Sequence, residues 1–469
     1  MATAAPGRLV QAGPEGGCGG SVASGRLWPP AVEHVGCPER VDSAAPDRFG
    51  AGGDAPARES PGAMRTGEGR DDPGKLLRGP EQSRQANFLE LFFDLVLVFA
   101  LKGVVDRVTP DLLDSDLAIR WSSLLYAVLL ALPLLWLWTT TVHITSRFDP
   151  RHQGIQVMVL VSAFGLLLMT TSLAHAFIGR GLVFAVPYVV LQVGRPLILA
   201  ALVRGHLPLR ALYLRSAAWS AVSAVPWLAG GILQDEARVL LWSVAIVLDL
   251  VGARVGWFVP HLRRRAISAW ALHSGHHLAE RYQQLLLVAL GESVLAVGTT
   301  YTVLPAGVGN TLGLVVAFVT TILLWRIYFY RSGQVLAEAV TMAKDRDSIG
   351  RRTGAAHMIM VIGILAVAVG AEVVQERPTA GVLPVWLVMI LGGPVLFLLG
   401  RIRLERVVFD RVSTRRTVGI VLLLALAIPL LFSTPLVAAT AAALVLLGIA
   451  IADARQAGRQ PGEVPTPSG

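Results

Sequence analysis

Twelve long apolar segments constrain the fold of this chain more than any other feature of its sequence. A helix needs about 20 mostly apolar residues to cross the hydrocarbon core of a bilayer. Runs close to this length lie roughly at 88–105, 121–142, 155–178, 182–203, 212–233, 239–260, 280–300, 311–331, 355–375, 382–401, 417–433 and 435–452. Only 16% of the residues are charged, whereas soluble domains carry about 25%. The sequence therefore predicts an all-α polytopic membrane protein with about twelve transmembrane helices.

The basic residues between these runs predict how the chain is oriented. The connections after even-numbered runs carry eighteen Arg and Lys residues, and those after odd-numbered runs carry five. Basic residues accumulate on the cytosolic side of a membrane. We therefore expect a multi-pass protein of the inner (plasma) membrane with both termini in the cytoplasm. The formal net charge of +9 fits this use of arginine, so the expected partner is the lipid bilayer and not nucleic acid. The sequence leaves the oligomeric state open.

Both ends of the chain differ from the apolar part. Residues 1–85 are rich in Gly, Pro, Ala and Arg and contain no apolar run, which predicts a disordered cytosolic tail. Met64 is an alternative start to Met1. Residues 454–469 are predicted to form a second, shorter cytosolic tail. Cys18 and Cys37 both lie in the first tail, so no disulfide or thiol ligand is expected in the membrane part.

The two halves of the apolar part resemble each other. NFLELFFDLVLVFA from Asn87 is similar to HLAERYQQLLLVAL from His277, which places Glu90 on Glu280. Three further matches follow in the same order: LeuLeuTrp at 134–136 and 323–325, GlyArgPro at 194–196 and GlyGlyPro at 392–394, and Pro226 and Pro429. Six runs per half is an even number, so the halves share one orientation. We predict two parallel six-helix repeats, at 86–265 and 266–453.

Two carboxylates interrupt the first apolar run, FLELFFDLVLVFALKGVV. Glu90 and Asp94 are four residues apart and therefore share one helix face. A charged carboxylate at the bilayer centre costs about 2.5–3.5 kcal/mol on insertion scales. Two explanations remain open. The pair fixes packing by bonding to Arg195 or Arg254, or it forms a protonatable or cation-binding cluster, for which Asp94 is the stronger candidate.

Glu292 lies in the middle of the seventh run, in ALGESVLAVG, between Gly291 and Ser293. The core of the same run contains no Lys or Arg that would pair with it. Ionisable residues inside membrane segments often mark ion pathways, which favours a role for Glu292 in carrying a proton. Asp249 and Glu372 are further intramembrane acids.

The segment HSGHHLAER places four polar residues on nearly one helix face: His273, His276, His277 and Glu280. Such spacing can bind a metal ion. We favour instead a polar helix entrance at the cytosolic surface, with His277 and Glu280 hydrogen-bonded locally, and predict no metal site.

ELFFDLVLVFAL together with HLAERYQQLLLVALGES resembles the bacterial low-temperature-requirement A (LtrA) proteins, over about residues 85–455. The family pattern maps onto Glu90, Phe92, Asp94, His277, Glu280, Arg281, Gly291, Glu292 and Ser293. The chain departs from it at Gln283 and Gln284, which follow Tyr282 where the family usually has a small or aromatic residue. The resemblance implies a membrane protein but no particular activity.

Several classes of function are disfavoured. The sequence contains no Walker A, GxSxG, HExxH or dinucleotide-binding motif, so we expect no enzyme and no cofactor. We expect a secondary transporter of a small solute or ion. Its transport or ion-binding candidates are Glu90, Asp94, Glu292, Ser293 and Arg195. Its cytosolic gate candidates are His277, Glu280 and Arg281. One alternative is an ion channel lined by the first and seventh runs, since FFD at 92–94 is distantly similar to the FSD motif of a potassium-channel family. Another is an intramembrane enzyme or a stress-linked structural protein.

Overall fold

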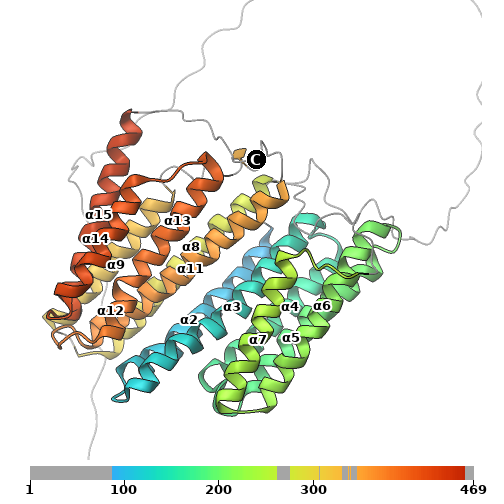
Figure 1. The fold of residues 1–469 in the computed structure, drawn as a ribbon, viewed down its shortest axis with the longest axis horizontal. Helices are drawn as coiled ribbons and strands as arrows, with labels where there is room; N and C mark the ends of the chain where they lie inside the picture. Colours follow the sequence, from blue (N-terminus) through green and yellow to red (C-terminus); the bar gives the residue numbers. More distant parts are fainter. Residues whose placement is uncertain are drawn as a thin grey trace, which may run out of the picture. The chain divides into compact units, whose positions relative to one another are not determined.

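The computed structural model describes residues 87–260, 275–305, 307–329, 336, 338–339 and 346–459 (Figure 1). Several predicted features lie outside these residues, namely most of the two predicted tails, the arginines at 263–265 and His273. The side chain of His276 also lies outside them. The two alternative starts, Met1 and Met64, also lie outside the described part.

Every regular element in the described part of the chain is a helix. The helices are α2 (Phe88–Leu113), α3 (Leu117–Arg147), α4 (Gln153–Ser172), η1 (Leu173–His175), α5 (Gly181–Leu202), α6 (Leu207–Ile232), α7 (Asp235–Arg254), α8 (Gly275–Val303), α9 (Val308–Phe329), α11 (Arg346–Glu376), α12 (Pro384–Ile390), α13 (Gly392–Phe409), α14 (Thr414–Leu430) and α15 (Pro435–Arg459). The predicted all-α class is confirmed. Helix α15 runs to Arg459, six residues into the segment predicted as a tail.

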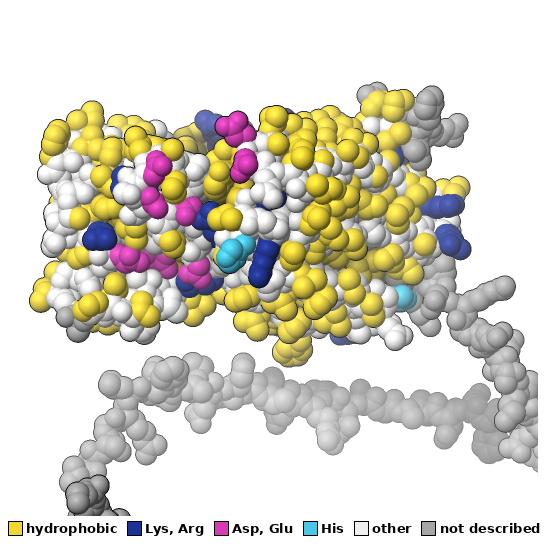
Figure 2. All heavy atoms as spheres, turned by 90° about the horizontal axis from the view of Figure 1, so that it is seen from below, with side chains coloured by type: hydrophobic (Ala, Val, Ile, Leu, Met, Phe, Trp, Pro, Cys, Tyr) yellow, Lys and Arg dark blue, Asp and Glu magenta, His cyan; other side chains and the backbone are white. Residues whose placement is uncertain are grey.

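Eight helical segments in the described part are long and apolar enough to cross a membrane. They are Leu117–Arg147, Gln153–His175, Gly181–Leu202, His277–Val303, Val308–Phe329, Ile349–Glu376, Pro384–Phe409 and Pro435–Gln456. Apolar side chains also cover much of the surface in Figure 2. In water such a surface would be unfavourable, whereas in lipid it is required. The chain is therefore a multi-pass membrane protein.

Helix α2 lies at the centre of the helix contacts. Its residues Phe93, Leu97, Leu101, Val104 and Val108 are buried, and their spacing of three and four places them on one side of the helix. Helix α2 packs against α3, α4, α8 and α11. Polar side chains on this buried side therefore face other helices and not lipid.

Small residues bring α11 and α13 into close contact. A Cβ atom added to Gly363 would lie 2.8 Å from the backbone oxygen of Gly393, and one added to Gly393 would lie 3.0 Å from that of Gly363. Glycine permits such an approach because it has no side chain, as at many helix interfaces in membranes. The contact fixes the position of α11, which carries Glu372.

Candidate functional site

The polar residues of α2 and α8 meet along the contact between these helices. Glu90 contacts His277 and Asp94 contacts Arg281, so the contact order runs the same way along both helices. Helices α2 and α8 are therefore parallel where they touch. Contact between helices in membranes usually involves apolar or small side chains, so a line of ionisable pairs at this position needs a specific explanation.

Glu90 and His277 form the first pair. Asn87 N donates a hydrogen bond of 2.9 Å to Glu90 Oε2, so Glu90 also caps the start of α2. His277 Nε2 lies 3.1 Å from the same oxygen, and His277 Nδ1 lies 3.0 Å from Ser146 Oγ on α3. Both Glu90 and His277 are fully buried. The pair therefore joins α2, α3 and α8 at one end.

Asp94 and Arg281 form a bidentate ion pair one turn further along α2. Arg281 Nη1 donates to Asp94 Oδ2 and Arg281 Nη2 to Asp94 Oδ1, each at 2.7 Å. Trp138 Nε1 of α3 donates to Asp94 Oδ1 at 2.8 Å, and Gln284 Oε1 accepts from Arg281 at 2.6 Å. Fork-to-fork pairing of this kind is among the strongest hydrogen-bonding arrangements of charged groups. We call Glu90, Asp94, Trp138, His277 and Arg281 the α2–α8 lock.

A second polar cluster lies further along the same helices. Glu372 of α11 accepts hydrogen bonds from Thr109 Oγ1 of α2 at 2.5 Å and from Thr300 Oγ1 of α8 at 3.2 Å. Lys102 Nζ of α2 lies 3.6 Å from Glu372 Oε1 and also pairs with Asp106. Eight residues separate Lys102 from Asp94, which is about 12 Å along a helix. We call Lys102, Thr109, Glu292, Thr300 and Glu372 the Glu372 cluster.

Glu292 differs from the other buried acids on α2, α8 and α11. Its side chain is fully buried, yet neither of its carboxylate oxygens has a hydrogen-bond partner among the described residues. The hydroxyl of the neighbouring Ser293 also lacks a partner there. The charged groups close enough to act on Glu292 are Glu372, Lys102 and Asp106. A buried acid without a partner is costly in its ionised form.

Comparison with known proteins gives the family. The family model for the bacterial low temperature requirement A protein (LtrA) matches residues 85–451. The chain belongs to the LtrA family. An uncharacterized protein of Rhizobium meliloti (strain 1021) is 33% identical over 326 residues, which cover 69% of this chain and 78% of that protein. No solved structure matches the chain.

The structure of this LtrA family member corrects the predicted partners of the first-run carboxylates. Asp94 does not pair with Arg195 or Arg254 but with Arg281, a residue predicted to belong to a separate gate. His277, from the same predicted gate, contacts Glu90. The structure therefore unites most of two predicted sites in the α2–α8 lock. Glu280, the third gate residue, is partly exposed on α8.

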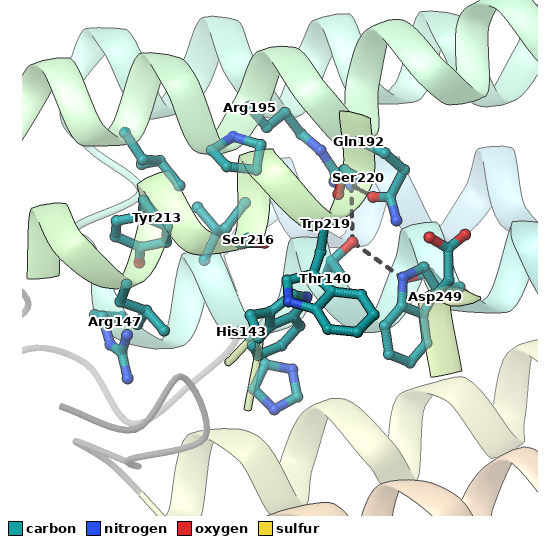
Figure 3. A pocket seen from close by; sticks show the side chains of 16 residues that line it. Thr140, His143, Arg147, Gln192, Arg195, Tyr213, Ser216, Trp219, Ser220 and Asp249 are labelled. Atoms are coloured by element: carbon teal, nitrogen blue, oxygen red, sulfur yellow. Dashed lines mark hydrogen bonds between the residues drawn. The ribbon is translucent and has the colours of Figure 1, made fainter. Parts of the chain in front are cut away.

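Arg195 belongs to neither cluster and lies on the wall of a cavity between α3, α5, α6 and α7 (Figure 3). Its guanidinium donates to the hydroxyls of Thr140 and Thr141, each at 2.8 Å. Arg254 is exposed on α7. The predicted site residues thus occupy three places in this LtrA protein.

Sequence reasoning missed Lys102, Thr109, Thr300 and Trp138. Lys102 had a visible signal, since it is the only basic residue in the first apolar run. Its relation to Glu372 and Glu292 depends on the contacts of α2 with α8 and α11, which the sequence does not give. In the described residues of this LtrA protein, no group of three or more His, Cys, Asp or Glu side chains gathers as metal ligands do.

Proposed function

We propose that the chain is a secondary transporter of a small solute, coupled to a proton that Glu292 and Glu372 carry. One observation carries the proposal. Glu292 is fully buried and without a hydrogen-bond partner among the described residues, on the same helix that the α2–α8 lock joins to α2. Buried ionisable groups in membrane segments are costly to keep, so their presence favours a function in ion movement.

The neighbours of Glu292 suggest how the proton is held. Glu372 and Lys102 act on it from α11 and α2. Two carboxylates close together titrate as a coupled pair, and one basic side chain balances one negative charge. Lys102 also pairs with Asp106, so these four side chains are neutral overall when both Glu292 and Glu372 are protonated. Loss of either proton would leave a net negative charge, which favours opening of the helix contact to water.

The α2–α8 lock is suited to act as a gate. Its two ionic contacts join one helix from each predicted half. The arginine pattern places the starts of α2 and α8 at the cytosolic side, so the lock would close the cytosolic end of the contact. Many secondary transporters work by rocking one repeat against the other around a fixed site. In such a motion Asp94 and Arg281 separate together with Glu90 and His277.

The arrangement of neighbours supports the proposed pair of six-helix repeats. In the first half α2 contacts α3 and α4, α4 contacts α5, α5 contacts α6, α6 contacts α7, and α7 contacts α3. In the second half α8 contacts α9 and α11, α11 contacts α13, α13 contacts α14, α14 contacts α15, and α15 contacts α9. The same ring of contacts thus occurs twice. The parallel direction of α2 and α8 also agrees with repeats of one orientation.

Exposed side chains support twelve spans. The four expected spans outside the eight apolar segments are α2, α6, α7 and α14. Each of these helices nevertheless exposes large apolar side chains, for example Phe99, Val225, Val247 and Val421. A helix that faced water would expose polar residues there. We therefore propose that these four helices also face lipid and cross the membrane.

Cysteine labelling can test whether α6 and α7 cross the membrane. Cys18 and Cys37 are the two cysteines of the chain, so replacing both with serine gives a cysteine-free background. If α6 and α7 cross the membrane, Gln234→Cys in the turn between them should react with a membrane-impermeant maleimide in intact cells. Arg204→Cys, between α5 and α6, should react only after permeabilisation. Labelling of Gln234→Cys that also requires permeabilisation would show that the two helices do not cross.

Flux into proteoliposomes tests the transport proposal. Purified protein is reconstituted with a pH-sensitive dye inside the vesicles, and small solutes are added outside with and without a pH gradient. We expect at least one solute to move protons across the membrane in a protein-dependent way, and the pH gradient to drive its accumulation. Ion current without coupling would favour the channel instead. Absence of any solute-dependent proton movement would contradict the proposal.

A further inference from the structure

The first half of the chain contains a partly open cavity of about 80 Å³ between α3, α5, α6 and α7 (Figure 3). A site for one water molecule needs about 10–15 Å³ on the same measure. The cavity therefore has room for several waters or for a small solute. Its wall combines Arg195 and Asp249 with the tryptophans Trp136, Trp219 and Trp257.

Arg195 presents a positive charge that neutral groups hold in place. Its side chain is 4% exposed. Besides Thr140 and Thr141, its hydrogen-bond acceptors are Gln192 Oε1 at 2.6 Å and the backbone oxygen of Leu191 at 3.0 Å. No carboxylate of the described residues forms an ion pair with it. A guanidinium that is oriented but not neutralised is a good binding group for the carboxylate of a ligand.

Asp249 presents the opposite charge in the same way. Its Oδ2 accepts hydrogen bonds from Tyr188 Oη at 2.9 Å and from Trp227 Nε1 at 3.2 Å. Both donors are neutral, and within the described ranges no Lys, Arg or His forms an ion pair with Asp249. Gln192 Nε2 donates to Tyr188 Oη at 3.4 Å. A chain of hydrogen bonds thus runs from Arg195 through Gln192 and Tyr188 to Asp249 and fixes the two charges relative to each other.

The tryptophans supply surfaces that suit an organic cation. Trp219 Nε1 donates to the backbone oxygen of Phe258 at 2.9 Å, which fixes the orientation of its indole ring. Ammonium and quaternary ammonium groups bind over tryptophan faces by cation–π attraction. Asp249 and these rings therefore provide complementary groups for the same cation.

The proposed repeat indicates that the fold does not require an arginine at this position. The sequence match that places GlyArgPro on GlyGlyPro puts Gly393 at the position of Arg195. A Cβ atom on Gly393 would lie 2.8 Å from the backbone nitrogen of Val367, so the second half is closely packed there. The arginine at this place is a feature of the first half alone, and the cavity that Val367 and Pro394 line in the second half is smaller, at about 30 Å³.

We propose that this cavity binds a small zwitterion, with its carboxylate at Arg195 and its ammonium group at Asp249 between the tryptophans. As the substrate site of the transporter, the cavity rests on the proposed function. Binding can be measured without flux, so the two proposals can fail separately.

Calorimetric titration of the purified protein in detergent tests the binding. The zwitterionic probes are glycine, alanine and N,N,N-trimethylglycine, and the single-charge probes are acetate and tetramethylammonium. Each charged contact contributes about 1.5–3 kcal/mol, which corresponds to tenfold or more in affinity. We expect saturable binding of at least one zwitterion and affinities at least tenfold weaker for both single-charge probes.

Glycerophosphoethanolamine represents a lipid headgroup. Its preference over every carboxylate-bearing zwitterion would contradict the proposal and assign the cavity to lipid.

Two variants connect binding to the cavity. Arg195→Gln and Asp249→Asn should each weaken binding of the preferred zwitterion at least tenfold, whereas Arg254→Gln, at an exposed position of α7, should leave it unchanged. If Arg195→Gln fails to fold, Asp249→Asn decides alone, because the amide has nearly the same shape. No saturable binding to the wild type, or unchanged affinity in Asp249→Asn, would overturn the proposal. Binding without flux would leave the cavity site standing and contradict the transport function.

Discussion

Asp94→Asn is expected to lower the free energy of unfolding by about 3–5 kcal/mol, the typical cost of breaking a buried ion pair by removing one partner. The amide keeps the shape of the carboxylate and can still accept from Trp138. It cannot neutralise Arg281, which is 1% exposed. The loss should appear as a lower melting temperature of the detergent-solubilised protein. Glu236→Gln, at an exposed position of α7, is the matched control and should melt like the wild type.

A second replacement should reverse this loss. Replacing both members of a buried ion pair by apolar residues of similar size is often neutral or stabilising. The double variant with Asp94→Leu and Arg281→Met should therefore melt at a higher temperature than Asp94→Asn. A normal melting temperature of Asp94→Asn would show that the pair contributes little to the folded state, and the α2–α8 lock would then lose its structural basis.

The helices could be predicted from the sequence, but the partner of Asp94 could not. Long apolar runs specify helices by hydropathy alone, and all twelve expected runs are mostly helical in their described residues, although α7 ends at Arg254, six residues before the end of its run. The pairing of Asp94 depends on which sides of α2 and α8 face each other. The repeat places Asp94 on Gln284, whereas the contact joins Asp94 to Arg281, three residues away. The residue of α8 that is matched to Asp94 and the residue of α8 that contacts Asp94 thus lie nearly one helical turn apart. A sequence match gives the first residue but not the second.

Under the proposed repeat, the two halves differ where they meet. The sequence match places Asn87 on His277 and Leu91 on Arg281. The acids of the lock thus remain on α2, while its basic groups occur on α8 alone. This division makes the contact complementary, because two identical acidic helix faces would repel each other. Asn87 still serves the lock by donating its backbone hydrogen bond to Glu90.

The remaining parts of the site depend on side-chain packing. Glu292 was a candidate from its position in an apolar run, but its isolation from hydrogen-bond donors required the structure. The cavity beside Arg195 was not predicted, because it is formed by side chains from four helices that are far apart in sequence. Its charged groups, Arg195 and Asp249, were both noted from the sequence as intramembrane residues.

Glu292→Gln is expected to abolish proton coupling while it leaves the fold intact. The carboxylate has no hydrogen-bond partner among the described residues, so the amide breaks no described contact. The melting temperature should stay close to that of the wild type, in contrast to Asp94→Asn. Glutamine carries no titratable proton, so solute-driven acidification or alkalinisation of the vesicle interior should fall to the level of protein-free vesicles.

Internal pH in paired proteoliposome preparations tests the central claim most directly. Wild type and Glu292→Gln are reconstituted at equal amounts, and the solute found in the flux screen is added to both, with Glu236→Gln as the control that keeps every group of the two clusters. The account predicts a proton signal for the wild type and the control, and none for Glu292→Gln, at equal melting temperatures. A Glu292→Gln preparation that moves protons with the solute as fast as the wild type would contradict it.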